Sequence, residues 1–309
     1  MITVVAPGFL TTVQDAGRPG FADLGVSASG AADPIALAVG NRLVGNDPAA
    51  AALEMTLVGG TFRFAAGGWI ALCGAPAAAK LDGLEIPGWS VQRVRAGGEL
   101  ACGAMTQGAR AYLCVRGGLD VPPVLGSGST HLASGLGGLA GRALAAGDRL
   151  ELDDRIVAEP ASRPVDPSRI PGYRPGDPFR VTEGLQSSWF MREAQAALVA
   201  TTWRTTDACD RMGLRLEGPA LRLQAPRELT TEGVTLGAIQ VPADGRPIIL
   251  FVEHQTTGGY PKIGCVISAD HARLGQLRPR TALRFARVEA DEAVRLLREQ
   301  AQAIDAIVR

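Results

Sequence analysis

Lysine is almost missing from this chain of 309 residues. Of its 31 basic residues, only Lys80 and Lys262 are lysines, and the rest are arginines. A lysine inside a polar loop of such a chain is not generic surface charge, because arginine serves that purpose everywhere else. Lys262 is therefore the first residue to consider for a role in binding or catalysis.

An excess of charge of one sign is also absent. The 31 acidic and 31 basic residues give a formal net charge of zero at pH 7 and are mixed along the sequence. Surfaces that bind nucleic acid or anionic membranes need a clustered basic face. We therefore expect neither nucleic acid nor membrane among the partners of this protein.

Metal motifs, disulfide motifs and long apolar runs are missing too. The three histidines, His131, His254 and His271, show no metal-ligand spacing, so no metal site is expected. The five cysteines include no C-x-x-C pair and mostly lie in apolar runs, as reduced core cysteines do. The N-terminal stretch lacks a basic region and reaches Pro7 and Asp15 too early for a secretory signal. No run approaches the roughly 18 apolar residues of a membrane span. Since no secretory signal is present and the cysteines are of the reduced core type, a reducing cytoplasm is the expected compartment.

Two common catalytic motifs are absent. No G-x-x-x-x-G-K-[ST] loop is present, because neither lysine follows a glycine, and there is no G-x-S-x-G nucleophile elbow. These absences exclude a Walker-type nucleotide site and an α/β-hydrolase serine. Lys80 has no methionine on either side, so it does not look like the biotin-carrying lysine of a carrier domain.

Short β-type runs separated by glycine and proline turns dominate from about residue 55 to residue 155, for example at 69–73 and 111–115. Regular short strands with turn signals indicate a sandwich or a barrel. The second half of the chain, from Phe179, repeats this scheme. We therefore predict a mainly β chain with a few helices.

Helices are expected at only a few places. Asp33 followed by Pro34 predicts the start of a helix that ends at Gly45. Further helices are expected at 48–53, 188–200 and 290–308. The last of these has an apolar stripe of core or interface type, formed by Val294, Leu297, Ala301, Ile304 and Val308.

Six prolines lie between residues 159 and 178. Proline at this density blocks helix interiors and the centres of sheets. We predict an N-terminal domain over residues 1–160, a proline-rich linker over 161–178, and a C-terminal domain over 179–309 that ends in a helix.

The polar loop at 255–263, with the sequence QTTGGYPKI, lies between two apolar runs. Its candidate groups are the side chains of Gln255, Thr256, Thr257, Tyr260 and Lys262 and the backbone of Gly258 and Gly259. The glycine pair allows backbone conformations closed to other residues and lets a ligand approach the main chain. Hydroxyls, an amide and an ammonium can bind a carbonyl group and stabilise its developing negative charge. The alternative is a plain hairpin loop with polar tips.

Four other polar clusters are candidates for a site. They are Gln14 with Asp15 and Arg18, Asp210 with Arg211, Glu232 with Gln240, and Glu253 with His254. His254 is a candidate general acid or base because its reference pKa lies near neutrality, although a lone histidine at a strand end is more often a hydrogen-bond partner. Arg211 is suited to an anionic ligand, or to a salt bridge with Asp210 or Glu217.

Many segments in a fixed order resemble one known family. They are LTTVQDAGRPG at 10–20, GAADP at 30–34, NRLVG at 41–45, LEMT at 53–56, VRGG at 115–118, LGSGST at 125–130, 137–148, DRMGLRLEG at 210–218, EGVTLGAIQVP at 232–242 and 254–270. The chain thereby resembles the C subunit of 5-oxoprolinase, also known as KipA or allophanate hydrolase subunit 2, which is related to part of the carboxyltransferase region of urea amidolyase. One turn departs from the family pattern, because Arg280-Thr281 stands where the family has Gly-Asp.

The resemblance implies two cyclophilin-like β-barrel domains and a cleft shared with a second, KipI-like subunit. A third, LamB-like subunit would complete an ATP-dependent assembly that opens 5-oxo-L-proline to L-glutamate, with ATP used by the assembled complex. In the urea amidolyase relatives the same cleft transfers a carboxyl group from carboxybiotin to urea, so biotin enters only under that alternative. A third alternative is a KipA-like antagonist that binds a KipI-type histidine kinase inhibitor.

Under the first hypothesis the chain is part of an enzyme, inactive alone, that binds a small amide or lactam. The catalytic candidates are Lys262, Tyr260, His254 and Glu232. The substrate-binding candidates are Gln255, Thr256, Thr257, Gly258, Gly259, Arg211, Gln240, Gln14, Asp15 and Arg18.

Overall fold

A computed structural model of the chain describes residues 1–153 and 158–307. The chain forms two compact units, of which unit 1 comprises Met1–Arg18, Ser29–Pro167 and the end of the chain from Ile304, and unit 2 comprises Pro19–Ala28 and Ser168–Ala303. Strands account for 32% of the residues and helices for 17%, which confirms the prediction of a mainly β chain with a few helices. The chain passes from unit 1 to unit 2 after Pro167, inside the segment 161–178 expected to be a linker. The predicted limits of the two domains, 1–160 and 179–309, stay a prediction.

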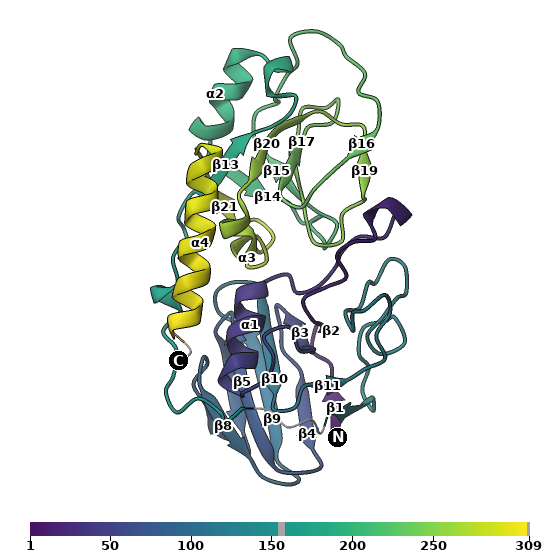
Figure 1. Cartoon of the computed structure of the whole chain (residues 1–309), viewed down its shortest axis with the longest axis vertical. Helices are drawn as coiled ribbons and strands as arrows, with labels where there is room; N and C mark the ends of the chain where they lie inside the picture. The colour runs from purple at the N-terminus through teal and green to yellow at the C-terminus, as the bar shows by residue number, and fades with distance from the viewer. Residues whose placement is uncertain (154–157, 308–309) are drawn as a thin grey trace. The chain divides into compact units, whose positions relative to one another are not determined.

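Unit 1 is built on two antiparallel sheets (Figure 1). The seven-stranded sheet has the order β11-β12-β1-β4-β9-β6-β7, and the five-stranded sheet has the order β2-β3-β10-β5-β8. The strands are β1 (Ile2–Ala6), β2 (Leu10–Gln14), β3 (Ala52–Thr56), β4 (Thr61–Phe64), β5 (Gly68–Gly74), β6 (Ala77–Leu81), β7 (Leu84–Glu85), β8 (Val91–Val94), β9 (Glu99–Met105), β10 (Arg110–Val115), β11 (Leu119–Asp120) and β12 (Arg149–Leu152). Apolar side chains from both sheets, among them Val4, Phe62 and Leu113, are fully buried in one core.

The helix predicted after Asp33 is present as α1 (Pro34–Leu43). The Asp33 side chain caps it by accepting a hydrogen bond from the backbone N–H of Ala36 at 3.0 Å, and Pro34 takes the first position, where no hydrogen bond is lost. The helix packs against β5 and β10 (Figure 1).

The helix predicted at 48–53 is wrong, because this stretch leads directly into the strand β3. All five residues of β3 are buried, between β2 on one side and β10 on the other. Burial in a central strand outweighs the helix propensity of an alanine-rich segment. Glu54 on this strand accepts hydrogen bonds from the Tyr112 hydroxyl at 2.6 Å and the Ala32 N–H at 2.8 Å, so this buried carboxylate is partnered.

Unit 2 is built on one eight-stranded sheet with the order β21-β14-β15-β18-β17-β20-β13-β22. The strands are β13 (Phe179–Glu183), β14 (Trp203–Thr205), β15 (Gly213–Glu217), β17 (Ala238–Gln240), β18 (Ile248–Leu250), β20 (Lys262–Val266), β21 (Ala282–Leu283) and β22 (Phe285–Arg287). The short helices of the chain are η1 (Ala22–Leu24), η2 (Pro167–Arg169), η3 (Ser187–Trp189), α2 (Arg192–Ala200), η4 (Ser268–Asp270) and α3 (His271–Leu274).

The two edge strands of this sheet are neighbours in the sequence. Only Arg284 separates β21 from β22, so the two edges of the sheet are brought together and the sheet is nearly a closed barrel. The strand β22 pairs with β13 in parallel, whereas the other pairs of this sheet are antiparallel. Closure removes exposed edges and gives the strands a rigid frame for side chains on the barrel surface.

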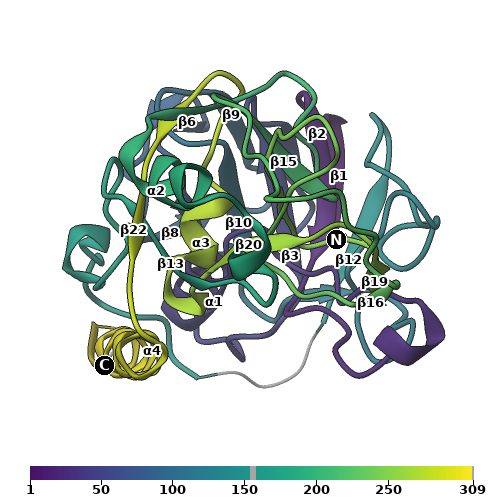
Figure 2. The same ribbon diagram turned by 90° about the horizontal axis from the view of Figure 1, so that it is seen from above.

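A separate two-stranded ribbon belongs to unit 2. It pairs β16 (Glu232–Gly233) with β19 (Thr257–Gly258), and both strands lie side by side in Figures 1 and 2. The loop predicted to carry chemistry is therefore one arm of this ribbon, and Glu232 lies on the other arm.

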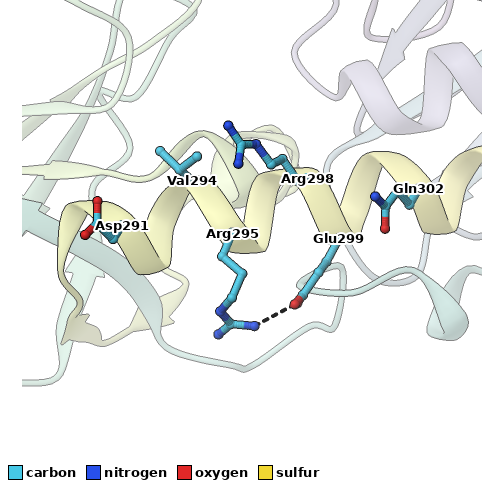
Figure 3. Close-up of a pocket in the computed structure, with 6 residues that line it drawn as sticks. All are labelled: Asp291, Val294, Arg295, Arg298, Glu299 and Gln302. Atoms are coloured by element: carbon cyan, nitrogen blue, oxygen red, sulfur yellow. Dashed lines mark hydrogen bonds and ion pairs between the residues drawn. The ribbon is translucent and has the colours of Figure 1, made fainter.

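The last helix, α4 (Ala290–Ile307), is present as predicted. Val294 and Leu297 of its apolar stripe are 48% and 42% exposed, and Val308 lies outside the described residues. A hollow of about 530 Å³ lies along α4, and Arg295 pairs with Glu299 there at 2.7 Å. Figure 3 shows the side chains that line it. Of the helices that the structure describes, none is long and apolar enough to cross a membrane.

Candidate functional site

Lys262 is held at the start of β20, opposite Gln240 on β17. Both residues are buried, with 5% and 1% of their surface exposed. Residues directly opposite in antiparallel strands point to the same face of a sheet, so the ammonium and the amide share one face of the barrel. The Lys262 ammonium contacts the Glu232 carboxylate, which the ribbon carries and which is 34% exposed. The predicted lysine and the predicted glutamate thus form one ion pair.

The glycine pair has a different use from the one predicted. Neither Gly258 nor Gly259 has a positive φ among the described backbone angles. Instead, a Cβ on Gly258 would lie 2.6 Å from Nε2 of Gln240, so the missing side chain lets the ribbon lie directly against that amide. The Gln240 amide oxygen accepts a hydrogen bond from Nε2 of Gln255 at 3.2 Å. Lys262, Gln240, Gln255 and the ribbon glycine are therefore neighbours.

Gln186, which the sequence patterns did not indicate, connects the two members of the ion pair. Its Nε2 donates to Oε1 of Glu232 at 3.0 Å, and its Oε1 accepts from the backbone N–H of Lys262 at 3.1 Å. Gly184 makes this approach possible, because a Cβ there would lie 2.2 Å from the carbonyl oxygen of Lys262. An isolated glutamine between β13 and η3 gives no motif, so only the fold reveals it.

The charge state of the pair follows from these contacts. The Lys262 ammonium is the main cause that lowers the pKa of the Glu232 carboxyl below its ordinary value, and the hydrogen bond from Gln186 lowers it further. Glu232 is thus an anion at neutral pH. The pair offers a substrate one cation and one carboxylate that are already in contact.

A cavity of about 650 Å³ lies over β15, β17 and β18, and neither Lys262 nor Glu232 is among the residues that line it. Its lining includes Gln240, Gln255 and Tyr260 from the predicted set, together with Arg215 and Arg246. Apolar side chains such as Leu216 and Ile248 lie in its lining beside many polar and charged ones. A small molecule in this cavity would contact part of the predicted polar loop.

The remaining loop residues have varied surroundings. Tyr260 is 49% exposed, so its hydroxyl is open to a ligand. Thr257 pairs with Gly233 in the ribbon, and the Thr256 carbonyl accepts from the Val234 N–H at 3.0 Å, so these two residues hold the ribbon together through their backbones. Their hydroxyls remain candidates for substrate contact.

Arg211 and His254 have protein partners of their own. Arg211 forms a buried ion pair with Glu253. Nδ1 of His254 lies 2.6 Å from the carbonyl oxygen of Gln255. Burial lowers the pKa of His254, and the carbonyl contact only partly opposes this shift, so the imidazole is neutral at pH 7. These contacts explain both residues structurally, and their assignment to catalysis or substrate binding stays a prediction.

Gln14, Asp15 and Arg18 belong to unit 1, whereas the polar loop belongs to unit 2. Gln14 donates to the Thr130 carbonyl at 3.0 Å, and Arg18 donates to carbonyl groups of the same segment, including that of Ser129. Asp15 accepts four hydrogen bonds, from the hydroxyls of Ser127 and Ser129 and from the N–H groups of Gly17 and Gly128. All three therefore fasten the glycine-rich segment around residue 128, and a role in substrate binding stays a prediction.

No group of three or more His, Cys, Asp or Glu side chains among residues 1–153 and 158–307 is arranged to hold a metal ion. The polar groups at and next to the polar loop are amides, hydroxyls, one ammonium and one carboxylate. These groups are suited to an organic carbonyl compound.

A barrel-like β unit in which a buried lysine pairs with a partly exposed glutamate, and whose polar loop lines a cavity, is suited to bind and polarise a small polar molecule. Comparison with known proteins narrows this class. The family model described as carboxyltransferase domain, subdomain A and B, matches residues 24–287. The chain belongs to this carboxyltransferase-domain family.

Individual relatives are similar along the whole chain. The C subunit of the 5-oxoprolinase of Escherichia coli (strain K12) is 40% identical over 97% of this chain and 95% of its own length. The corresponding 5-oxoprolinase protein of Haemophilus influenzae is 36% identical over 100% of this chain and 98% of its own. The crystal structure of the K. lactis urea amidolyase superposes with a TM-score of 0.92 at 30% identity, over 99% of this chain but only 20% of that much longer one. The resemblance inferred from the sequence segments is confirmed.

Proposed function

We propose that this protein is the C subunit of an ATP-dependent 5-oxoprolinase that opens 5-oxo-L-proline to L-glutamate. The observation that carries the proposal is the end-to-end similarity to the C subunit of the E. coli 5-oxoprolinase, at 40% identity over 97% of this chain and 95% of that one. A single domain shared with a longer enzyme would not give this mutual coverage. The name of that relative also implies further subunits, so the chain is one part of an assembly.

The geometry at the polar loop supports a role in binding a lactam. Attack on a ring amide places negative charge on the carbonyl oxygen, and a buried ammonium stabilises such charge far better than it would in water. Lys262 is the group we assign to this task, with Glu232 holding the ammonium in place. The neighbouring amides of Gln240 and Gln255 would orient the substrate, and the exposed phenol of Tyr260 would reach it from the cavity.

The assembly would provide the rest of the site. We propose a KipI-like subunit and a LamB-like subunit as partners, and a cleft completed by the KipI-like one. The two cations predicted in unit 2, Lys262 and Arg211, already have carboxylate partners in this chain. They are suited to a neutral amide rather than to the charges of a triphosphate, so we assign ATP to the assembled complex.

A biotin-dependent carboxyltransferase subunit is the second candidate function. The family description and the likeness to the K. lactis urea amidolyase favour it. Urea is also a planar amide, so the same lysine and amide groups would bind it, and biotin would be the carboxyl donor in that case. The two candidates differ in product, because one releases glutamate and the other releases carboxylated urea. Only the second requires carboxybiotin as the carboxyl donor.

The decisive experiment is co-expression of this chain with the KipI-like and LamB-like proteins, followed by assay of glutamate release from 5-oxo-L-proline with ATP. Glutamate release that depends on all components is the expected result. An intact, folded assembly that releases none would contradict the proposal. Carboxylation of urea by the same chain with a carboxybiotin donor would then support the second candidate.

The role of Lys262 can be tested in the same assembly. Lys262→Ala should lower kcat by about 100- to 1,000-fold, the usual loss for one oxyanion-stabilising donor. Lys80→Ala is the matched control, since it removes the other lysine, which is exposed on β6. Near-normal turnover by Lys262→Ala would show that the ammonium does not contact the substrate.

A further inference from the structure

Gln186 lies in the loop after β13, and only 6% of its surface is exposed. It makes a two-way contact with the backbone of Lys262. Its side-chain oxygen accepts from the Lys262 N–H at 3.1 Å, and its own backbone N–H donates to the Lys262 carbonyl at 3.3 Å. These two bonds hold the backbone of Lys262, which is the first residue of β20 and the catalytic candidate.

The same side chain also holds the partner of Lys262. Nε2 of Gln186 donates to Oε1 of Glu232 at 3.0 Å, and this is the oxygen that contacts the Lys262 ammonium. Three segments that are far apart in the sequence therefore meet at one carboxylate oxygen. The Gln186 side chain bonds to both of the other residues, so it links the strand that carries the lysine to the ribbon that carries the glutamate.

We infer that Gln186 is a positioning residue, which holds the Lys262 ammonium and the Glu232 carboxylate in the geometry needed to bind and polarise the substrate carbonyl. This role rests on the proposed function, because it takes Lys262 as the group that acts on the substrate. A glutamine suits the task because it supplies one acceptor and one donor and stays neutral at every pH. Misplacement of a reacting group by about 1 Å can cost about 100-fold in rate.

The Gln186 contact also affects how Glu232 responds to pH. The charged group that faces Glu232 is Lys262, on β20, and Gln186 adds a neutral donor. Both contacts favour the carboxylate, so removal of the Gln186 donor must raise the pKa of Glu232. The ion pair would then be lost at a higher pH as the solution is acidified. Loss of a hydrogen bond that does not reach Glu232 would leave this pKa unchanged.

Two substitutions test the side-chain hydrogen bonds of Gln186. Gln186→Met keeps the length of the side chain and removes both side-chain hydrogen bonds. Gln186→Glu keeps an acceptor for the Lys262 N–H but places a negative charge next to Glu232. The matched control is Gln195→Met, because Nε2 of Gln195 donates to the carbonyls of Ser187 at 2.9 Å and Phe190 at 3.1 Å, in and next to η3, without contacting the pair.

The first test measures kcat and KM for 5-oxo-L-proline in the assembled enzyme as a function of pH. Gln186→Met should lower kcat by about tenfold or more and shift the acidic limb of the profile to higher pH, and Gln186→Glu should shift it further. Gln195→Met should leave both unchanged. Equal behaviour of Gln186→Met and Gln195→Met would overturn the inference.

The second test does not need activity, so it distinguishes failure of the inference from failure of the proposed function. The side-chain carboxyl carbon of Glu232 is followed by NMR in the full-length chain labelled with ¹³C-glutamate, and its signal is assigned with Glu232→Gln. The pKa of Glu232 should be higher in Gln186→Met than in the unsubstituted protein and unchanged in Gln195→Met. An unchanged pKa in Gln186→Met would overturn the inference, whether or not the assembly releases glutamate.

Discussion

The buried ion pair of Arg211 and Glu253 allows a direct test of whether Arg211 serves the fold or the substrate. Their side chains are only 7% and 3% exposed. Arg211→Met removes the guanidinium and leaves the Glu253 carboxylate without its charge partner in a site that water does not reach. Breaking a buried pair in this way costs about 3–5 kcal/mol. We therefore expect Arg211→Met to lower the free energy of unfolding of unit 2 by that amount.

The double variant Arg211→Met/Glu253→Leu is the control for this prediction. Replacing both members of a buried ion pair by apolar residues of similar size is often neutral or stabilising, because the cost of burying two charges disappears with them. The double variant should therefore recover most of the stability that the single variant loses. This recovery is specific to a pairing role, since a general packing defect at Arg211 would persist.

Urea titration monitored by tryptophan fluorescence measures the effect, because unit 2 contains its own reporters in Trp189 and the fully buried Trp203. With a slope of about 2 kcal/mol per molar urea, the loss corresponds to a midpoint lower by about 1.5–2.5 M. The reasoning is refuted if Arg211→Met unfolds at the original midpoint, or if the double variant is as unstable as the single one. A stable Arg211→Met chain that forms an inactive assembly would instead assign Arg211 to the substrate.

Two further predictions concern stability. Tyr112→Phe removes a hydroxyl that donates to Glu54 at 2.6 Å and accepts from the Asp33 N–H at 2.8 Å. Because one buried carboxylate and one buried N–H each lose a partner, the unfolding free energy of unit 1 should fall by about 3 kcal/mol in denaturant titration; a loss below about 1 kcal/mol would contradict this. Burial lowers the pKa of His254 and of His271. The unfolded chain therefore binds protons that the folded chain does not, so stability should fall as pH drops below about 6.5, and replacing both histidines by glutamine should flatten this slope in thermal unfolding measured from pH 8 to pH 5.

The sequence identified the groups of the candidate site better than it identified their partners. Lys262 stood out because lysine is rare in this chain, and the glycine turn marked its loop. The contact between Lys262 and Glu232 joins the barrel strand β20 to the ribbon strand β16, and Gln186 is 76 positions away from Lys262 in the sequence. Pairings over such distances depend on strand order, which local patterns do not determine. The family resemblance indicated the fold and the candidate activity, but it did not indicate Gln186.

One expectation failed for a physical reason, and one candidate residue has contacts that its local pattern did not indicate. The alanine-rich stretch at 48–53 favours a helix locally, yet it leads into a central strand because that strand is buried on both sides. Asp15 is a polar residue in a loop rich in glycine, which is typical of a binding residue, but it accepts four hydrogen bonds from its own chain. Propensity and composition describe a residue in isolation, whereas in both cases the neighbours determine the outcome.

The closure of the eight-stranded sheet has a consequence for how unit 2 is made. Its first strand, β13, pairs with its last, β22, more than 100 residues later, and β21 must be in place on the opposite edge. The ribosome therefore has to synthesise the chain through Arg287 before the barrel can close. Until then, β13 has an unpaired edge on one side, and a pairing of such long range forms slowly. Unit 1 faces the same constraint over a still longer range, because β1 pairs with β12 and its larger sheet is complete only at Leu152.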